Sequence, residues 1–221
     1  MFRLDGSHVY RSLRLEQFPW LLHGFGTRLS TDWPDSDGLA TAKQIHSDQI
    51  LIADKPGYLG PGDALISNQP GVTVAIRTAD CLPILIVDAR TRAVAAVHAG
   101  WRGVVAEIAS KTVDTMRLQF GSRPEDLEIA IGPGIGPCCF EVGPEVAVQF
   151  RAFFPERNDL HSRTKLDLAE TITRQLRRNG VTPSQISPSG LCTCCKSEFE
   201  SYRRDREDAG RMTAAIGVME S

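Results

Sequence analysis

Three side chains of the kinds that bind transition metals stand beside breaks in apolar runs of the chain. His46 ends the motif Lys-Gln-Ile-His, Cys81 lies within Thr-Ala-Asp-Cys-Leu-Pro, and His98 opens His-Ala-Gly-Trp-Arg-Gly. Two imidazoles and one thiolate would hold zinc and leave its fourth position open, as in a catalytic rather than a structural zinc site. Zinc in such a site lowers the pKa of a bound water towards about 7 and polarises a substrate oxygen. Asp80, next to Cys81, is the candidate catalytic residue, either by orienting a ligand or by carrying a proton.

The spacing of these three residues does not identify a metal site by itself. They are separated by 35 and 17 residues, which matches no established zinc motif. Isolated histidines and a buried cysteine are more often ordinary core or surface residues. The same donors also describe a blue-copper centre, but the chain has only five histidines and no His-x-His pair, whereas coupled copper clusters need many imidazoles. Zinc is therefore the predicted metal, and copper is the alternative.

Short apolar strands are predicted to position these side chains. Five runs of aliphatic and β-branched residues are bounded by turn residues, and they cover residues 49–53, 63–67, 71–77, 83–88 and 92–98. Only turns separate the last three, so we expect those three to pair with one another as a buried sheet. Two further strands are expected at 127–131 and 210–219.

Helices are predicted where apolar residues recur at three- and four-residue spacing. The expected helices cover residues 105–116, 144–154 and 166–178. Gly121 is a stop signal for the first, while Asp167 near the start of the third and Gly180 after its end suit the helix dipole and a glycine cap. Strands and helices mix without strict alternation. The prediction is an α+β or mixed α/β fold, a single domain over residues 1–221 with a mixed β-sheet flanked by helices.

Composition limits the class of protein. The apolar fraction is 42% and the charged fraction 24%, close to the average of soluble globular chains. The formal charge is −2, which argues against a general nucleic-acid binder, because such proteins need an excess of basic residues. No apolar run approaches the roughly 18 residues of a membrane span, and the first residues contain no apolar signal core. We expect a cytoplasmic protein that binds neither nucleic acid nor membrane.

Five further cysteines lie in two clusters, Cys138-Cys139 and Cys192-Thr193-Cys194-Cys195. Without a secretion signal, most of them should be thiols. If the clusters met in space, they would offer more than four thiolates to a second metal, but they lack the paired Cys-x-x-Cys spacing of a zinc ribbon. Small buried residues or an adventitious disulfide are the favoured interpretations.

Five motifs follow one another in the order typical of one protein family. They are Lys-Gln-Ile-His (43–46), Thr-Ala-Asp-Cys-Leu-Pro (78–83), His-Ala-Gly-Trp-Arg-Gly (98–103), Ile-Gly-Pro-Gly-Ile-Gly-Pro-Cys-Cys-Phe-Glu-Val-Gly (131–143) and Ser-Tyr-Arg-Arg-Asp (201–205). From about residue 43 to 219 the chain resembles the YfiH family, also called the laccase-domain or peptidoglycan editing factor family. The resemblance implies a mixed α/β fold, with His46, Cys81 and His98 as metal ligands. It also implies a zinc-dependent enzyme for phosphorolysis of adenosine, inosine, guanosine or methylthioadenosine and for adenosine deamination.

One segment departs from the pattern of that family. Family members carry a longer stretch, with an Asn-Leu-Gly segment and a helix, between a Thr-Arg motif and the Gln-x-His motif. In this chain Arg28 and Gln44 are only 16 residues apart, so that helix is expected to be missing or rebuilt. Arg28 stands where the family has an arginine that faces phosphate or substrate, and it is retained as a candidate for substrate binding.

Other substrate contacts are predicted from side-chain chemistry. Gln44 could reach a substrate base if it extends from a loop. Arg203 and Arg204 could bind phosphate, because a guanidinium offers two parallel hydrogen bonds, or they could form a structural ion pair with Asp205. The glycine-rich segment 132–136 could line an anion with backbone amides or could be a tight connection. It lacks the lysine and the spacing of a phosphate-binding loop or a dinucleotide fingerprint.

Four functions are compatible with an open metal site in this sequence. Zinc-dependent purine nucleoside chemistry is favoured, with a purine nucleoside and phosphate as the small-molecule partners. An amidase that edits peptidoglycan precursors and a copper-dependent polyphenol oxidase, or laccase, are the enzymatic alternatives. A non-catalytic binding protein with a structural zinc is the fourth. We expect a monomer or a weak homodimer.

Overall fold

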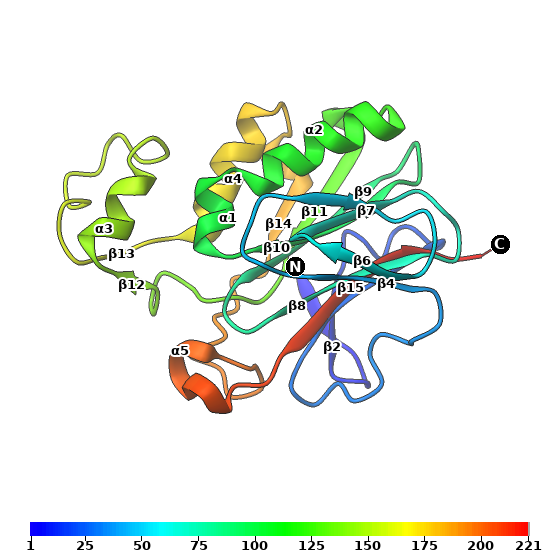
Figure 1. Cartoon of the computed structure of the whole chain (residues 1–221), viewed down its shortest axis with the longest axis horizontal. Helices are drawn as coiled ribbons and strands as arrows, with labels where there is room; N and C mark the ends of the chain where they lie inside the picture. Colours follow the sequence, from blue (N-terminus) through cyan, green and yellow to red (C-terminus); the bar gives the residue numbers. More distant parts are fainter. Residues whose placement is uncertain (221) are drawn as a thin grey trace.

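Two mixed β-sheets stack on each other in the computed structural model, which describes residues 1–220 (Figure 1). The seven-stranded sheet has the order β1 (Phe2–Leu4), β2 (Val9–Ser12), β3 (Leu21–Gly26), β15 (Met212–Val218), β8 (Thr73–Thr78), β4 (Leu39–Lys43), β6 (Gly57–Pro61). The six-stranded sheet has the order β14 (Ile186–Pro188), β11 (Leu127–Ile131), β9 (Leu82–Asp88), β10 (Val94–Ala99), β7 (Ala64–Ser67), β5 (Ile50–Ile52). A small third sheet pairs β12 (Glu141–Val142) with β13 (Thr164–Lys165).

Helices cover the outer face of the six-stranded sheet, so the molecule has three layers (Figure 1). The α-helices are α1 (Trp101–Val105), α2 (Ile108–Phe120), α3 (Pro144–Ala147), α4 (Leu168–Arg178) and α5 (Tyr202–Asp205). Four short 3₁₀ turns are η1 (Pro124–Asp126), η2 (Val148–Phe150), η3 (Pro183–Gln185) and η4 (Arg206–Asp208). This architecture confirms the predicted mixed α/β fold, with two large mixed sheets where one was expected. Within residues 1–220, no helix is both long enough and apolar enough to cross a membrane.

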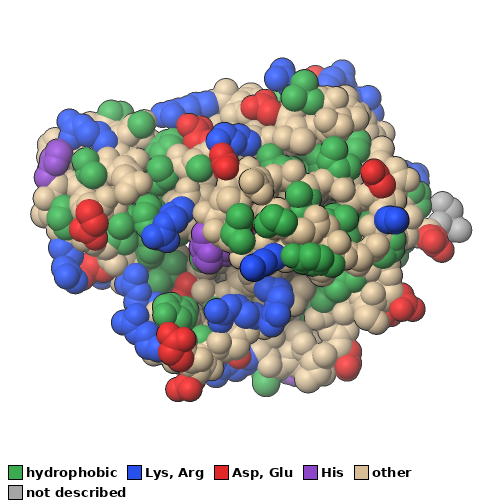
Figure 2. Space-filling model, in the orientation of Figure 1, with side chains coloured by type: hydrophobic (Ala, Val, Ile, Leu, Met, Phe, Trp, Pro, Cys, Tyr) green, Lys and Arg blue, Asp and Glu red, His purple; other side chains and the backbone are tan. Residues whose placement is uncertain are grey.

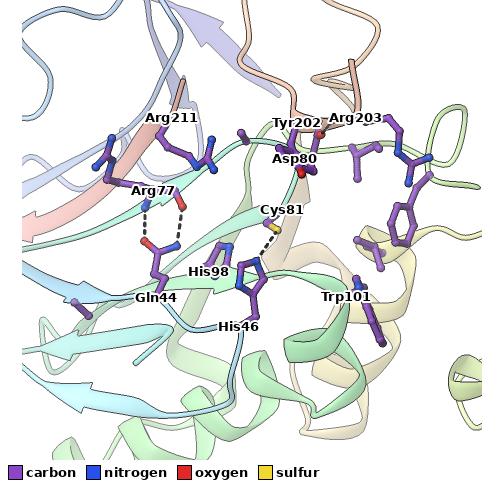
Figure 3. A pocket seen from close by; sticks show the side chains of 15 residues that line it. Gln44, His46, Arg77, Asp80, Cys81, His98, Trp101, Tyr202, Arg203 and Arg211 are labelled. Atoms are coloured by element: carbon purple, nitrogen blue, oxygen red, sulfur yellow. Dashed lines mark hydrogen bonds between the residues drawn. The ribbon is translucent and has the colours of Figure 1, made fainter. Parts of the chain in front are cut away.

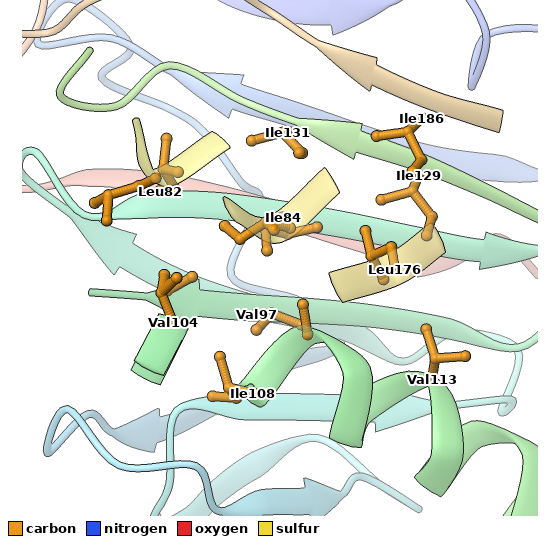
Figure 4. Packing of buried hydrophobic residues seen from close by; sticks show 14 of the residues in the cluster. Leu82, Ile84, Val97, Val104, Ile108, Val113, Ile129, Ile131, Leu176 and Ile186 are labelled. Atoms are coloured by element: carbon orange, nitrogen blue, oxygen red, sulfur yellow. The ribbon is translucent and has the colours of Figure 1, made fainter. Parts of the chain in front are cut away.

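The six-stranded sheet is buried on both faces. Every residue of β9 is buried, because alternate side chains enter two separate cores. Ile84 belongs to the core under the helices, together with Val97 of β10 and Leu176 of α4 (Figure 4). Leu85 belongs to the core between the two sheets. Burial on both faces explains why the sequence shows continuous apolar runs here and no alternation.

The predicted pairing of residues 71–77 with the next two strands is wrong. β8 pairs with β15 and β4 in the seven-stranded sheet, whereas β9 and β10 pair with each other in the six-stranded sheet. Residues 79–81 carry the chain from one sheet to the other, and Asp80 within this crossing has a φ of 81°. An apolar run indicates a buried strand, but it does not indicate in which of two stacked sheets the strand lies.

The helix predicted over residues 105–116 is interrupted. It begins earlier, as α1, and a break separates it from α2, because Glu107 adopts a left-handed φ of 60°. The predicted stop is confirmed, since Gly121 has a φ of 69° directly after α2. Residues 27–38, the segment that is short for the family, form a connection between β3 and β4 that contains no helix.

The other two predicted helices differ in outcome. The one predicted over 144–154 is only α3 followed by η2. The one predicted over 166–178 is confirmed as α4, where the carboxylate of Asp167 accepts a hydrogen bond from the backbone N–H of Glu170. Gly180 has a φ of 89° just beyond its end, as expected of a glycine cap.

Candidate metal centre

The three predicted ligands meet at one end of the six-stranded sheet. His98 lies at the end of β10, and antiparallel pairing puts this end beside the starts of β9 and β7. β5 runs parallel to β7 and therefore starts at the same end. Cys81 directly precedes β9, Asp63 directly precedes β7, and His46 lies in the turn that leads into β5. The strand topology thus brings together side chains that are far apart in the chain.

The geometry of His46, Cys81 and His98 fits a single ion (Figure 3). Their donor atoms lie within 4.8 Å of one another, and the Sγ atom of Cys81 is 3.9 Å from Nε2 of His46. The two imidazole rings meet edge to face, with their centroids 4.9 Å apart. Zinc bonds of about 2.3 Å to sulfur and about 2.0 Å to nitrogen would put tetrahedral ligands ~3.5 Å apart. A small inward movement of these side chains would therefore complete the coordination of an ion by three protein donors.

Asp63 orients two of these ligands, and the sequence analysis missed it. Its buried carboxylate accepts a hydrogen bond of 2.8 Å from Nδ1 of His98, which directs Nε2 of that ring towards the metal position. The same carboxylate accepts the backbone N–H groups of Ile45, His46 and Ser47 at 2.7–3.2 Å. These bonds stabilise the turn in which His46 has a positive φ of 58°. The available signal in the sequence was an acid directly before a buried apolar strand.

Contacts within this group shift the pKa values of His98, Cys81 and Asp63. Burial by itself would lower the pKa of His98, but the hydrogen bond to Asp63 and the neighbouring Cys81 outweigh it and raise the pKa to about 9. Burial by itself would raise the pKa of the Cys81 thiol, but hydrogen bonds from His46 and His98 lower it to about 7. Burial also opposes ionisation of Asp63, yet its hydrogen bonds hold the pKa well below the usual carboxyl range. The group therefore favours an ionised thiolate and carboxylate around the imidazoles.

Gly100 leaves the space that two ligands need. A Cβ atom at this position would lie 2.9 Å from Cδ2 of His46 and 3.1 Å from Sγ of Cys81. Both distances are shorter than ordinary van der Waals contact, so a larger side chain would displace the ligands. The backbone φ of −70° at Gly100 is open to every residue, so close approach is the reason for glycine here.

A cavity of about 550 Å³ lies in front of the three donors. Its size is in the range of sites for small organic ligands. Because His46, Cys81 and His98 all line it, a fourth ligand position on the metal would open into this cavity. Apolar and aromatic residues form much of the remaining wall, namely Ala42, Ala79, Trp101, Ile135, Phe140, Leu168 and Tyr202. Figure 2 shows Lys and Arg side chains gathered around an exposed histidine on this face of the molecule.

Two arginines of the cavity were not predicted from the sequence. Arg77 is the one exposed residue of β8, where the other five residues are buried. Arg211 stands directly before β15, and both side chains lie on the same side of the cavity (Figure 3). The signal that could have identified Arg77 is a single charge inside an otherwise apolar strand, four residues before Cys81.

Gln44 lines the cavity, but its amide is bound to the backbone. Its Oε1 atom accepts a hydrogen bond from the backbone N–H of Arg77, and its Nε2 atom donates one to the carbonyl oxygen of Arg77, both at 2.7 Å (Figure 3). The side chain therefore fixes the end of β8. The predicted contact of Gln44 with a substrate base would require these two bonds to open.

Only one of the three arginines that the sequence predicts to bind substrate or phosphate lines the cavity. Arg203 lines the cavity, and its guanidinium donates to the backbone carbonyls of Cys139, in the loop after β11, and of Glu141, at the start of β12. Arg204 is not part of the cavity wall, because its guanidinium pairs with Asp205 and donates to carbonyls of the loop before α5. Arg28 is likewise turned away, with Glu200 and Asp205 at 3.1 Å and 3.2 Å. Only Arg203 of these three is positioned to meet a ligand of the cavity.

Asp80 lines the cavity, but both of its carboxylate oxygens already accept hydrogen bonds. One oxygen accepts from the hydroxyl of Thr193 at 2.7 Å, and the other from the backbone N–H of Arg203 at 2.6 Å. The backbone carbonyl of Asp80 accepts from the N–H of Ile135 at 2.7 Å. These bonds join three segments of the cavity wall, and they favour a positioning role for Asp80 over that of a proton carrier.

The remaining histidines lie away from this centre. His23 is buried and accepts a hydrogen bond from the backbone N–H of Ser12, and burial lowers its pKa to about 4. His161 neighbours Arg151, and His8 lies in the turn before β2. Among residues 1–220, His46 and His98 are the only histidines that belong to a group of metal donors. The additional imidazoles of a coupled copper cluster are therefore not present at this site.

Known proteins share both the sequence and the fold. A family model described as multi-copper polyphenol oxidoreductase laccase matches residues 27–219. A protein of Deinococcus radiodurans named purine nucleoside phosphorylase is 42% identical over 188 residues, which cover 83% of this chain and 71% of that protein. The purine nucleoside phosphorylase YfiH of Shigella flexneri is 37% identical over 186 residues, which cover 80% and 72%. The crystal structure of YlmD from Geobacillus stearothermophilus has a TM-score of 0.89 at 28% identity, covering 99% of both chains.

These similarities extend over most of the chain and include the donor residues of the metal centre. The region matched by the family model begins before His46 and ends after β15, so it contains all six strands of the six-stranded sheet and four of the seven strands of the other, without β1, β2 and β3. The order of the five motifs, the stacked mixed sheets and the matches themselves agree with one another. The chain belongs to the family of laccase-type domains that includes YfiH and YlmD.

Proposed function

We propose that this protein is a zinc-dependent enzyme that cleaves purine nucleosides with phosphate. The observation that carries the proposal is the position of three metal donors in the wall of a cavity that Arg77, Arg203 and Arg211 also line. The cavity offers one open metal position, several cations and an aromatic surface. A nucleoside and a phosphate ion need these three features together.

The residues around His46, Cys81 and His98 suit zinc. Two imidazoles and one thiolate are donors that zinc prefers, and Asp63 fixes one imidazole in the orientation that ligation requires. When bound, zinc would supply Lewis acidity at the side of the cavity where these donors lie. The other contributions come from side chains of this chain.

Arg77 and Arg211 are suited to bind the attacking phosphate. Arg77 lies in β8 and Arg211 directly precedes the adjacent strand β15, and both line the same side of the cavity (Figure 3). Guanidinium groups bind phosphate through paired, charge-assisted hydrogen bonds. In phosphorolysis a phosphate oxygen forms a bond to C1′ of the sugar while the bond from C1′ to the purine nitrogen breaks. The purine keeps the electron pair, takes up a proton and leaves, so the products are ribose 1-phosphate and the free base.

Aromatic side chains across the cavity are suited to hold the purine. Trp101, Phe140 and Tyr202 line the cavity, and Trp101 lies on the side opposite Arg77 and Arg211 (Figure 3). Flat aromatic rings stack on purines and exclude water from the cavity. Asp80 supports this wall, because it binds both Thr193 and the backbone of Arg203 next to Tyr202.

The names of the relatives support a nucleoside substrate for this chain. Both curated relatives described above are named purine nucleoside phosphorylase. Adenosine deamination is the second reaction that the same open metal position could serve. The copper oxidase alternative has less support, because no further imidazoles of residues 1–220 approach the three donors.

Incubation of the zinc-loaded protein with adenosine and phosphate, followed by chromatography, tests the proposal. Adenine together with ribose 1-phosphate is the expected result, and inosine would reveal deamination. His98→Ala should lose the bound zinc and reduce turnover at least about 100-fold, since metal catalysis contributes several kcal/mol. His161→Ala replaces an exposed histidine outside the cavity and should retain full activity. If adenosine, inosine and guanosine all remain uncleaved by the zinc-loaded protein, the proposal is wrong.

A further inference from the structure

Four thiols form a second group of metal donors outside the cavity. The Sγ atoms of Cys138, Cys139, Cys192 and Cys195 lie within 4.8 Å of one another. The two sequence clusters therefore meet in space, whereas the sequence alone favours small buried residues or an adventitious disulfide. Cys194 lies between two members of the group in the sequence but is not part of it.

The sheet topology explains why the two loops converge. β11 and β14 run parallel and side by side, so the loops that follow them leave the same end of the six-stranded sheet. A further bridge pairs Gly134 with Cys192, and it continues the ladder into both loops. Each loop then makes a tight turn. In the first loop the carbonyl of Gly136 accepts a hydrogen bond from the N–H of Phe140, and in the second the carbonyl of Cys192 accepts one from the N–H of Lys196. These turns direct two thiols from each loop towards a common point.

The distances between the sulfur atoms fit ligation of one ion. The Sγ atom of Cys195 is 3.5 Å from that of Cys138 and 3.4 Å from that of Cys139. A disulfide requires about 2.05 Å between sulfurs, whereas zinc–sulfur bonds of about 2.3 Å put tetrahedral sulfurs ~3.8 Å apart. Cys192 and Cys195 also have Cys-x-x-Cys spacing, and the tight turn after Gly136 brings the adjacent pair Cys138 and Cys139 to the same place.

The surroundings of the thiols support a bound thiolate. The backbone N–H of Gly136 donates a hydrogen bond to Sγ of Cys192 at 3.2 Å. A Cβ atom at Gly136 would lie 3.3 Å from Cβ of Cys192 and 3.4 Å from Sγ of Cys138, so glycine permits the loops to approach. Cys138 and Cys195 are exposed and Cys192 is buried, which gives an ion access from one side.

We propose that Cys138, Cys139, Cys192 and Cys195 bind a second zinc ion in a closed tetrathiolate site. Four protein donors leave no position for a substrate, so this ion has a structural role. It would join the loop that supplies Ile135 and Phe140 to the cavity wall to a second loop that supports the wall from behind. The first loop leads into Phe140, and the second carries Thr193, which binds Asp80.

Metal analysis of reduced protein with Zn²⁺ as the only added metal tests this proposal. The protein is loaded with Zn²⁺ and dialysed against metal-free buffer, and zinc is then counted per chain. Two ions are expected for the unchanged protein, and one for Cys195→Ser and for His46→Ala. None is expected for the double variant. Cys194→Ser is the matched control and should retain both ions.

The His46→Ala variant separates this proposal from the proposed function. It should lose nucleoside cleavage and keep the second ion, and Co²⁺ in place of zinc should then give the strong absorption of four thiolate ligands. Loss of the ion in Cys195→Ser should also lower the melting temperature relative to Cys194→Ser. The proposal is overturned if the unchanged protein binds only one zinc, which His46→Ala removes. Iron in the site, or a disulfide between Cys195 and Cys138 or Cys139 in protein purified without added oxidant, would also overturn it.

Discussion

The two groups of metal donors differ in how the chain supports them and in what they leave open. Cys81 and His98 stand at the ends of buried strands, His46 stands in a turn, and a buried carboxylate orients both histidines. The four thiols stand on two irregular loops, where one backbone N–H is their nearest support. The first group has three donors and faces a cavity, whereas the second has four donors and faces none. The number of donors and the rigidity of their support therefore suit the first group to chemistry and the second to holding loops together.

The largest expected difference between the two groups is the pH dependence of their zinc affinity, because protons compete with zinc for the donor atoms. Zinc requires a neutral imidazole and a thiolate, so a proton must leave His98, whose pKa is raised to about 9, and another must leave Cys81, whose pKa is lowered to about 7. Between pH 7 and 9 only the His98 proton is still displaced, so apparent affinity should rise about tenfold per pH unit and level off above 9. Partial desolvation and neighbouring thiols raise the pKa of Cys138 to about 11, so the thiol group should continue to gain affinity above pH 9. Competition with a chelator at buffered pH measures the affinity of the first group alone in Cys195→Ser and that of the thiol group alone in His46→Ala. A zinc affinity of the first group that does not change between pH 7 and 9 would contradict the prediction.

Removal of the charge of Asp63 should affect only the first group. Asp63→Asn keeps an oxygen for Nδ1 of His98, but it cannot accept all the backbone N–H groups of the turn at His46. Zinc affinity of the first group should fall by about 10- to 100-fold, which is typical when a partner of a ligand is lost. Chelator competition measures the loss, with Asp114→Asn, a substitution of an exposed carboxylate on helix α2, as the control. Equal weakening of the thiol group would mean that the substitution acts through the fold as a whole.

Removal of one arginine side chain from the cavity wall should weaken phosphate binding and leave zinc binding by both groups of donors unchanged. Arg77→Ala should raise the KM for phosphate about tenfold, because a charge-assisted hydrogen bond contributes about 1.5 kcal/mol or more. Zinc content should not change, and Arg77→Lys should recover part of the effect. Steady-state kinetics at varied phosphate concentration measures it, with exposed Arg117→Ala as the control. An unchanged KM would remove Arg77 from the proposed phosphate site.

The smallest effects are expected from substitution of the glycine that lies beside each group of donors. Gly100→Ala would put a Cβ atom 2.9 Å from His46, whereas Gly136→Ala would put one 3.3 Å from its nearest neighbour, Cys192. Overpacking of about 1 kcal/mol should weaken zinc binding about fivefold for Gly100→Ala, and Gly136→Ala should have less effect on the thiol group. Gly6→Ala, where a Cβ atom meets nothing within 4 Å, is the control for both titrations. A larger loss of zinc affinity in Gly136→Ala than in Gly100→Ala would show that the thiol loops adjust less readily to an added methyl group than the surroundings of His46 and Cys81 do.

Sequence reasoning identified the three donors of the first group because their residue types are rare and each stands where an apolar run breaks. It missed Asp63 and Arg77 because an acid before a strand and a charge on a strand are both common on ordinary surfaces. Their importance depends on neighbours that only the folded chain provides. For the same reason Arg28 and Arg204, which have suitable chemistry, are bound instead by nearby carboxylates.

The fold was predictable as far as local pattern determines it. Apolar runs located the central strands, and the cap residues of α4 located that helix. The position of β8 in the seven-stranded sheet, apart from β9 and β10, was not predictable, because the sequence of residues 79–81 does not differ from that of a short turn between paired strands. Convergence of the cysteine loops was not predictable either, since it follows from the parallel pairing of β11 and β14 across many intervening residues.

The side-chain amide of Gln44 has a consequence for the mouth of the cavity. Its two hydrogen bonds to the backbone of Arg77 reproduce those that a neighbouring peptide unit would make. β4 can therefore turn away towards His46 while the main chain of Arg77 stays paired. The ladder between β4 and β8 ends at Ala40 and Val74, and beyond it the exposed side chain of Arg77 lines the cavity from a backbone that Gln44 holds in place.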